Sequence, residues 1–278
     1  MRRKRKLVPV LLLAAAAALV LLPVVYTVCN AFMSGEEIAL YYLGGQEGFA
    51  AFHLLPDRFS LDGFYQVLLR RPDYLVKFWN SLGWTLLMVA LQLLVVCPTA
   101  YGFARFRFPG REALFFLIVL LMLLPYQVTL VANYMVLDRM GLIGSWWAVV
   151  LPAAFSPLGV FIMRQAMSSV PIELLEAARL DGAGELRTLF QIVLPRCRGA
   201  VASVVILSFV EYWNMVEQPL MFLADRRQYP LSIFLAQANS GVPEIGFACG
   251  VLAMLPVLLL FLYFEDALVE GIAASAKR

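Results

Sequence analysis

Six apolar runs, each long enough to cross a bilayer, constrain this chain more than any other feature of its sequence. Of its 278 residues, 62% are hydrophobic and only 15% are charged, well below the roughly 25% of soluble domains. About 20 apolar residues in a helix span the hydrocarbon core of a membrane. We therefore expect an all-α integral membrane protein with a single transmembrane domain over residues 1–278, with helices at about 7–33, 78–103, 113–137, 146–163, 200–223 and 245–264.

The first apolar run is interpreted as an uncleaved transmembrane helix. It follows a basic stretch at residues 2–6, and as a helix it would be roughly 40 Å long, which exceeds the ~30 Å hydrocarbon core. A cleaved signal peptide is the alternative, but it would have a shorter apolar region followed by a small-residue cleavage site.

The positions of the lysines and arginines predict that both termini lie in the cytoplasm. With six spans and this orientation, most of the 22 basic residues fall in cytoplasmic segments, as the positive-inside rule requires. The long polar segment at residues 34–77 is then an outer loop, and residues 164–199 form a cytoplasmic loop between the fourth and fifth spans.

This cytoplasmic loop is predicted to form a short helix, a tight turn and an amphipathic helix. Pro171 suits the first position of a helix, and Gly182 can adopt the left-handed conformation that a helix stop often needs. Pro195 should end the second helix. Four apolar residues of that helix recur at i, i+3, i+4 and i+7 and are expected to share one face: Leu186, Leu189, Phe190 and Val193.

The residue types of this loop resemble the EAA loop of ABC importer permeases, and most closely that of carbohydrate-uptake permeases of the maltose-transporter type. The resemblance is carried by Glu176, Ala177, Ala178, Asp181, Gly182, Ala183, Phe190, Ile192, Leu194 and Pro195. Gly199 departs from the pattern, because the family usually has a proline there. In that family the loop forms a coupling helix that docks in a groove of the ATPase subunit. A generic cytosolic helical hairpin is the alternative.

The resemblance extends over most of residues 78–264 and implies a function. It implies a permease subunit of a binding-protein-dependent ABC importer for carbohydrate in the bacterial cytoplasmic (inner) membrane. It also implies a second homologous permease, two ATPase subunits and an extracytoplasmic solute-binding protein as partners. The subunit would form half of the translocation path and work by alternating access. A permease for another solute and an ion-coupled secondary carrier are the alternatives.

Several classes of chemistry have little support in the sequence. No glycine is followed by lysine, so the chain has no Walker A loop; we expect ATP and Mg²⁺ on the partner ATPase, and neither a cofactor nor enzymatic activity in this chain. Its four cysteines are far apart and His53 is its one histidine, which disfavours metal clusters and nucleophilic catalysis. The net charge of +3 is too small to indicate nucleic-acid binding.

Polar residues in the fifth run are candidates for the translocation path. Glu211, Asn214 and Glu217, with Gln218, are spaced so that a continuous helix would place them on about a third of its circumference. A carboxylate facing lipid would cost several kcal/mol, so these groups should face protein or water, and they can hydrogen-bond to sugar hydroxyls. The alternative is a structural acid paired with a neighbouring helix.

The outer loop at residues 224–244 is a candidate contact for the binding protein. Small polar residues there would allow close backbone approach, and the resemblance implies that such a loop enters the binding protein's cleft. The alternative is a solvated connector. The candidate residues are Gln237, Ala238, Asn239, Ser240 and Gly241.

Overall fold

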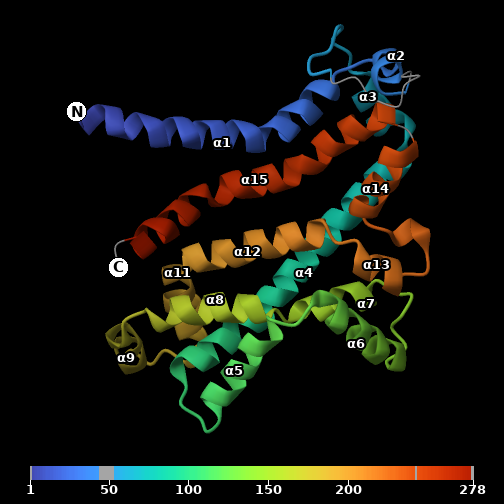
Figure 1. The fold of residues 1–278 in the computed structure, drawn as a ribbon. Coiled ribbons are helices and arrows are strands. Elements are labelled where there is room, and N and C mark those ends of the chain that lie inside the picture. Colours follow the sequence, from blue (N-terminus) through green and yellow to red (C-terminus); the bar gives the residue numbers. More distant parts are fainter. Residues whose placement is uncertain (1, 44–52, 242, 277–278) are drawn as a thin grey trace. The chain divides into compact units, whose positions relative to one another are not determined.

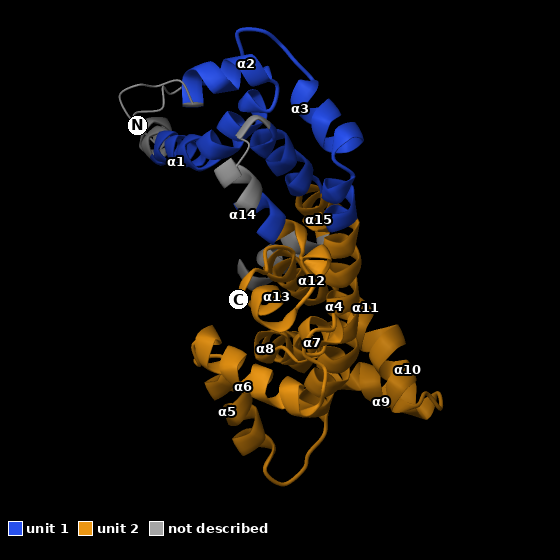
Figure 2. Ribbon diagram, turned by 90° about the vertical axis from the view of Figure 1, so that its right-hand side faces the viewer, with its two compact units in different colours: residues 1–78, 233–255 blue, residues 79–232, 256–278 orange. Residues whose placement is uncertain are grey.

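A computed structural model describes residues 2–43, 53–241 and 243–276, and every regular element in these ranges is a helix (Figure 1). The all-α prediction is therefore confirmed for the described part of the chain. The chain separates into two compact units, shown in Figure 2. Unit 1 comprises residues 1–78 and 233–255, and unit 2 comprises residues 79–232 and 256–278. The assignment of the whole chain to one transmembrane domain stays a prediction.

Unit 1 contains the first apolar helix and the segment predicted as the outer loop. The described part of this segment is largely helical. The next long helix begins at Pro72, a residue suited to the first position of a helix, and not at about residue 78. The elements that lie wholly or partly in unit 1 are α1 (Arg2–Asn30), α2 (Gly35–Ile38), the π-helix η1 (Ala39–Leu43), α3 (Asp62–Tyr65), the π-helix η2 (Gln66–Arg70), α4 (Pro72–Arg105), α14 (Leu231–Gly241) and α15 (Pro243–Ala276).

Aromatic contacts hold the elements of unit 1 together. The ring of Tyr26 on α1 meets the edge of Phe247 on α15, with ring centroids 5.9 Å apart. The hydroxyl of buried Tyr74 donates to the carbonyl of Cys249, at 3.2 Å. Phe32, just after α1, stacks on Phe59 with centroids 4.9 Å apart. Helices α1, α4 and α15 therefore share one packed core within this unit.

Unit 2 contains most of α4 and a series of shorter helices. Helix α8 packs against both α5 and α12, and a buried apolar cluster joins α4, α8 and the loop predicted to be cytoplasmic. The further elements of this unit are α5 (Arg111–Leu121), α6 (Tyr126–Arg139), α7 (Trp147–Val150), the 3₁₀-helix η3 (Pro152–Ala154), α8 (Pro157–Ser168), α9 (Ile172–Leu180), α10 (Glu185–Thr188), the π-helix η4 (Leu189–Val193), α11 (Leu194–Arg196), α12 (Arg198–Trp213), α13 (Glu217–Phe222) and the 3₁₀-helix η5 (Arg226–Gln228).

The apolar runs give four clear membrane helices in the described part and six only if two bent pairs each make one crossing. The four are Pro9–Asn30, Pro72–Arg105, Trp147–Ser168 and Ile245–Asp266. Helices α5 and α6 meet at 106°, because Pro125 disfavours helical geometry at the preceding residue and the chain leaves the helix there. The span expected at about 113–137, which contains Pro125, is therefore two helices that meet at a sharp bend.

The fifth apolar run is also interrupted. Helix α12 ends at Trp213, Asn214 is its C-cap, and α13 begins only at Glu217. The continuous helix expected at residues 200–223 is thus replaced by two helices. A second bent pair, with an angle of 84°, joins Glu185–Arg196 to α12.

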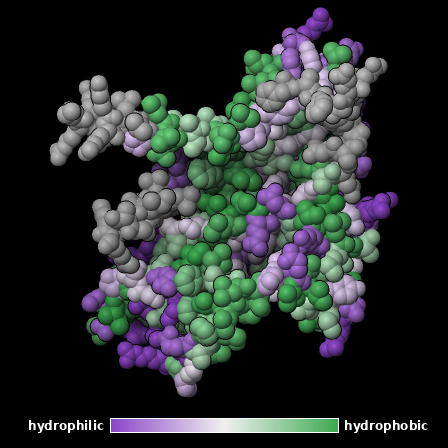
Figure 3. All heavy atoms as spheres, in the orientation of Figure 1, coloured by the Kyte–Doolittle hydropathy of each residue, from purple (hydrophilic) through white to green (hydrophobic). Residues whose placement is uncertain are grey.

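Many large hydrophobic side chains are exposed on these helices, as expected for surfaces that face lipid or another subunit. Helix α1 contains an 18-residue stretch with a mean hydropathy of 2.5, of which 0% is buried within the chain. Hydrophobic residues also cover much of the face shown in Figure 3. Such a surface is favourable only where a bilayer or a partner covers it.

We predict that Gly159→Val loosens the packing of α8 on α4. A Cβ at Gly159 would lie 3.2 Å from Gln92 Nε2 and 3.3 Å from both methyl carbons of Val96. Overpacking of this kind costs about 1–3 kcal/mol, and we expect a lower thermal midpoint of the purified protein. Gly83→Val is the matched control, because no atom lies within 4 Å of a Cβ there. Equal midpoints for the two variants would contradict the prediction.

Candidate functional site

Gly182 ends the first helix of the predicted cytoplasmic loop, as the sequence analysis expected. Its φ is +77°, in the left-handed region. The Gly182 N–H donates to the carbonyl of Arg179 at 3.0 Å, and the Ala183 N–H donates to the carbonyl of Ala178 at 2.9 Å. These two bonds form a Schellman motif, which satisfies carbonyls that the helix end leaves free. Pro171 is the N-cap of α9, one position before the place predicted for it.

The second half of the loop differs from the predicted amphipathic helix. It consists of α10, a π-helix and α11, and the wider π-helical turn changes which residues share a face. Leu189 and Val193 are buried in the core of unit 2, whereas Leu186 and Phe190 are 69% and 52% exposed. The prediction that these four residues share one face is therefore wrong.

The residues that carry the EAA resemblance lie mostly on the outside of unit 2. Ala178 is buried, and Ala183, Ile192 and Leu194 are partly buried. The exposed ones are Glu176, Ala177, Asp181, Gly182, Phe190 and Pro195. Apolar neighbours are exposed on the same segment, including Ile172, Leu186 and above all Leu180, which is 89% exposed. We call the exposed residues of 172–195 the outer face of the loop; it combines backbone turns and uncovered apolar side chains, which suits a protein partner.

The inner side of this loop is fastened to α4 by a hydrogen-bonded acid. The Tyr101 hydroxyl donates to Glu185 Oε2 at 2.7 Å, and Arg179 Nη2 lies 3.0 Å from Glu185 Oε1. Glu185 thus links α9, α10 and α4. The Tyr101 hydroxyl and the Arg179 guanidinium hold the pKa of Glu185 below its ordinary value, so this acid stays ionised at neutral pH.

Arg105 fastens the beginning of the loop to the same helix. Its guanidinium donates to the carbonyl of Met167 and, at 2.6 Å, to that of Val170. These carbonyls lie at the end of α8 and just beyond it, where a helix leaves such groups unsatisfied and where positive charge is favourable. The sequence analysis did not identify Tyr101, Arg105 or Glu185; the only signal was that Tyr101 and Arg105 are four residues apart and share one face of α4.

The candidate path residues do not share one helical face. Asn214 lies at the break after α12, where its side chain donates to the carbonyl of Val210 at 2.9 Å. Glu211 and Glu217 are exposed, on α12 and α13 respectively, while Gln218 is buried. The helical-wheel argument made for these four residues is therefore wrong, but Glu211, Asn214 and Glu217 all stay uncovered within this chain.

A buried polar contact next to Glu211 was missed by the sequence analysis. The Tyr212 hydroxyl donates to Gln92 Oε1 at 2.6 Å, and it also lies 3.2 Å from the carbonyl oxygen of Ala153. Gln92 is 1% exposed. The contact fixes α12 against α4 and η3, because a buried polar group that loses its partner is costly.

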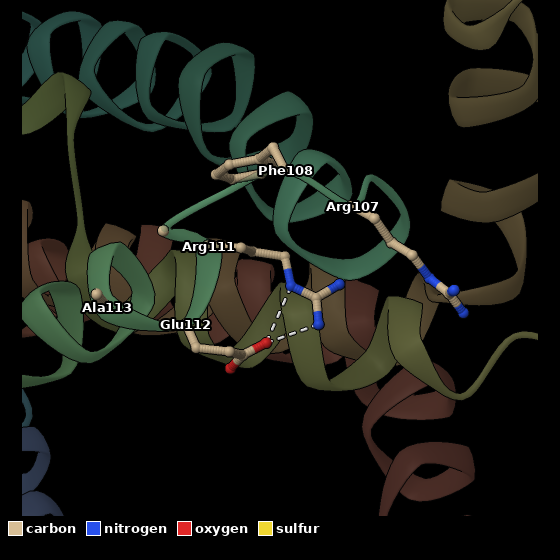
Figure 4. A pocket seen from close by; sticks show the side chains of 6 residues that line it. Arg107, Phe108, Arg111, Glu112 and Ala113 are labelled. Carbon is tan, nitrogen blue, oxygen red and sulfur yellow. Dashed lines mark hydrogen bonds and ion pairs between the residues drawn. The ribbon is translucent and has the colours of Figure 1, made fainter.

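A small pocket lies at the turn between α4 and α5 (Figure 4). It is lined by Arg107, Phe108, Gly110, Arg111, Glu112 and Ala113. Arg111 donates to Glu112 Oε1 at 2.6 Å, and Arg164 lies 3.5 Å from the other carboxylate oxygen. The acid is thus engaged by two cations, and none of the candidate path residues lines this pocket.

The candidate contact for the binding protein lies in the segment between α13 and α15. The segment at residues 224–244 includes η5 and α14, so it is partly helical. The side chains of Gln237, Ala238, Asn239, Ser240 and Gly241 lie outside the described residues.

Comparison with known proteins identifies the family. Residues 97–273 match the model of the binding-protein-dependent transport system inner membrane component. The chain belongs to this family. It is therefore a multi-pass membrane protein and a permease subunit of a binding-protein-dependent ABC importer, and the family is one of transport subunits and not of enzymes.

Two relatives and one solved structure show the extent of the similarity. The arabinooligosaccharides transport system permease protein AraQ of Halalkalibacterium halodurans is 28% identical over 80% of this chain and 81% of its own length. The lactose transport system permease protein LacG of Rhizobium radiobacter is 32% identical over 74% of this chain and 76% of its own length. A chain from the crystal structure of a bacterial ABC transporter involved in the import of the acidic polysaccharide alginate superposes with a TM-score of 0.79, at 21% identity, over 95% of this chain and 96% of that chain.

We predict that Tyr101→Phe releases the loop from α4 locally. The change removes a hydrogen bond to a charged acceptor, worth about 1.5–3 kcal/mol when buried and less at this half-exposed acid. Hydrogen exchange of the backbone amides at residues 179–188 should become faster. Tyr263→Phe, at a tyrosine that is 80% exposed, is the control. Unchanged exchange in the Tyr101→Phe protein would show that this bond does not hold the loop.

Proposed function

We propose that this chain is one of two homologous permease subunits of a bacterial carbohydrate importer in the cytoplasmic membrane. The observation that carries the proposal is the two-sided loop at residues 172–195. Glu185 bonds its inner side to α4, and Arg105 holds the residues just before it. Its outer face exposes EAA-like residues and uncovered apolar side chains such as Leu180. A surface built this way can receive a movement from a partner and pass it to the membrane helices.

The partner proposed for the outer face is an ATPase subunit. The chain has no Walker A loop, so ATP and Mg²⁺ are proposed to bind two ATPase subunits, one under each permease. Closure of the ATPase dimer would move the loop, and Arg105 and Tyr101 would carry this movement to α4 and the end of α8. The cavity between the two permeases would then turn outward, which is alternating access.

The proposed path lies where Glu211, Asn214 and Glu217 are exposed. These three residues flank the break between α12 and α13, where the backbone no longer forms a continuous helix. In membrane proteins, non-helical backbone is tolerated only where protein or a water-filled cavity surrounds it. A position against the second permease, with access to water, satisfies this requirement and offers acceptors to sugar hydroxyls.

Carbohydrate is the proposed substrate class because of the relatives' names and the chemistry of these groups. AraQ and LacG are named for arabinooligosaccharides and lactose. A solute-binding protein outside the membrane is proposed to deliver the sugar, and residues 237–241 are proposed as part of its contact. Another solute remains the alternative within the same family.

Uptake into proteoliposomes tests both the transport class and the role of the loop. The wild-type permease, its partner permease, the ATPase and the binding protein are expected to import labelled oligosaccharide only when ATP is supplied. We predict that Gly182→Leu keeps the complex assembled but reduces ATP-driven uptake at least about tenfold, because φ of +77° disfavours a side chain and leucine would alter the outer face of the loop.

Gly141→Leu is the matched control for backbone strain. Its φ is +67°, and like Gly182 it has no atom within 4 Å of a built Cβ, but it lies outside the loop. Normal coupling in Gly182→Leu, or an equal defect in both variants, would contradict the role of the loop. Uptake driven by an ion gradient without the ATPase would instead indicate a secondary carrier.

For the path, we predict that Glu211→Gln and Asn214→Ala alter uptake while the complex stays intact. Glu211→Gln keeps the shape and one acceptor but removes the charge, so the Michaelis constant or the preference among oligosaccharides should change. Loss of the partner permease on purification would indicate a structural ion pair. Unchanged kinetics in both variants, for every sugar transported, would exclude these residues from the path.

A further inference from the structure

Three potential metal ligands converge in unit 1, in the segment between α1 and α3. Glu37 on α2, His53 and Asp57 each offer one donor atom, and these atoms all lie within 4.8 Å of one another. His53 Nε2 is 3.7 Å from Glu37 Oε1 and 3.5 Å from Asp57 Oδ1. His53 is the single histidine of the chain, and neither the transport mechanism nor the EAA resemblance uses it.

The imidazole of His53 is held in place from two sides. Its ring stacks on Tyr41 with centroids 4.1 Å apart and planes 7° apart. Its backbone carbonyl accepts hydrogen bonds from Asn30 Nδ2 at 3.3 Å and from the Tyr42 hydroxyl at 3.2 Å. The stacking thus sets the plane of the ring, and the two hydrogen bonds hold the backbone that carries it.

The two carboxylates are also oriented by their surroundings. Ser34 caps α2 and accepts from the Glu37 N–H, which sets Glu37 at the third helical position, and Glu37 Oε1 accepts the Asp57 N–H at 2.5 Å. The Tyr41 hydroxyl donates to Asp57 Oδ2 at 2.9 Å, so the other oxygen is the one that faces His53. The Tyr41 bond to the oxygen of Asp57 that does not face His53 is of the kind that orients ligands in metal sites, whereas the Asp57 N–H bonds the same Glu37 oxygen that faces His53.

Both distances around Nε2 are too long for hydrogen bonds, and the 3.5 Å separation from Asp57 lies within the range expected between two ligands of one zinc ion. Hydrogen bonds join nitrogen and oxygen at about 2.7–3.2 Å, shorter than both separations here. Two ligands that each lie about 2.0–2.2 Å from a tetrahedral zinc ion are roughly 3.3–3.6 Å apart. Moreover, Nε2 is buried and has no hydrogen-bond partner among the residues that the structure describes, which is costly for a polar atom unless a ligand occupies the position.

We propose that Glu37, His53 and Asp57 bind a divalent transition-metal ion of the zinc type. One imidazole nitrogen and two carboxylate oxygens are a ligand set that Zn²⁺ accepts, and two negative charges balance the ion in the partly buried site. Three protein ligands leave a coordination position for water. The ion joins α2 to the irregular chain at residues 53–57 and thereby stabilises this segment, which is predicted to lie outside the membrane.

Zinc titration of the purified full-length chain, carrying no histidine tag and first stripped with a chelator, tests the proposal. Zn²⁺ should raise the thermal midpoint in a concentration-dependent way. Tyr41 only supports a ligand, and Tyr41→Phe should weaken zinc affinity about tenfold. Glu37→Gln and His53→Gln each remove a ligand, so each should weaken zinc affinity by more than the roughly 10–100-fold that is typical for loss of a supporting residue. Glu36→Gln, at the exposed neighbouring acid, is the matched control and should bind normally.

X-ray absorption of the zinc-loaded wild-type protein gives a second readout that does not depend on variants folding. The spectrum should show one imidazole and otherwise only oxygen ligands, and no sulfur at the longer distance of about 2.3 Å. Sulfur ligation would assign the ion to the cysteines and overturn the proposal. So would equal binding by wild type and His53→Gln, or absence of binding in the wild type, which would leave His53 as a group that pairs with the acids only when protonated.

Discussion

The attachment of the loop at residues 164–199 to α4 is the interaction on which the arrangement of this loop depends. Arg105 donates to the carbonyls of Met167 and Val170, and Tyr101, one turn earlier on α4, donates to Glu185. Free carbonyls at a helix end attract a cation, and an ionised acid attracts a hydroxyl donor. Both the beginning of the loop and its turn are therefore held against α4. A shift of the loop relative to α4 would strain the Arg105 contact and the Tyr101 contact.

Apolar packing completes this attachment and explains why one side of the loop stays free. Leu175, Leu189 and Val193 are buried in the same cluster as Val96 and Ala100 of α4. The π-helix η4 brings Leu189 and Val193 to the core, and as a result Phe190 is turned outward. The same backbone irregularity thus anchors the loop and exposes a large apolar side chain on its outer face.

The features set by composition and by single residues could be predicted from the sequence, whereas those set by tertiary packing could not. Hydropathy located the apolar runs, and the conformational freedom of glycine located the stop at Gly182. Periodicity failed at Leu186 and Phe190, because it assumes 3.6 residues per turn and η4 does not obey that spacing. The bond from Tyr101 to Glu185 joins residues 84 positions apart, so no local pattern could indicate it.

The breaks in the apolar runs limit what hydropathy alone can say about a transporter. Hydropathy averages over a window, so it locates the apolar runs at 113–137 and 200–223 but not the breaks within them, where Pro125 separates α5 from α6 and Asn214 ends α12. Each break frees backbone groups that need water or a protein partner. At the second break the residues beside those groups, Glu211 and Glu217, are themselves exposed within this chain. A bilayer cannot cover carboxylates and open backbone without a large cost, so the break requires a polar neighbour. This requirement is the physical reason for proposing that the second permease and the solute meet the chain at this break.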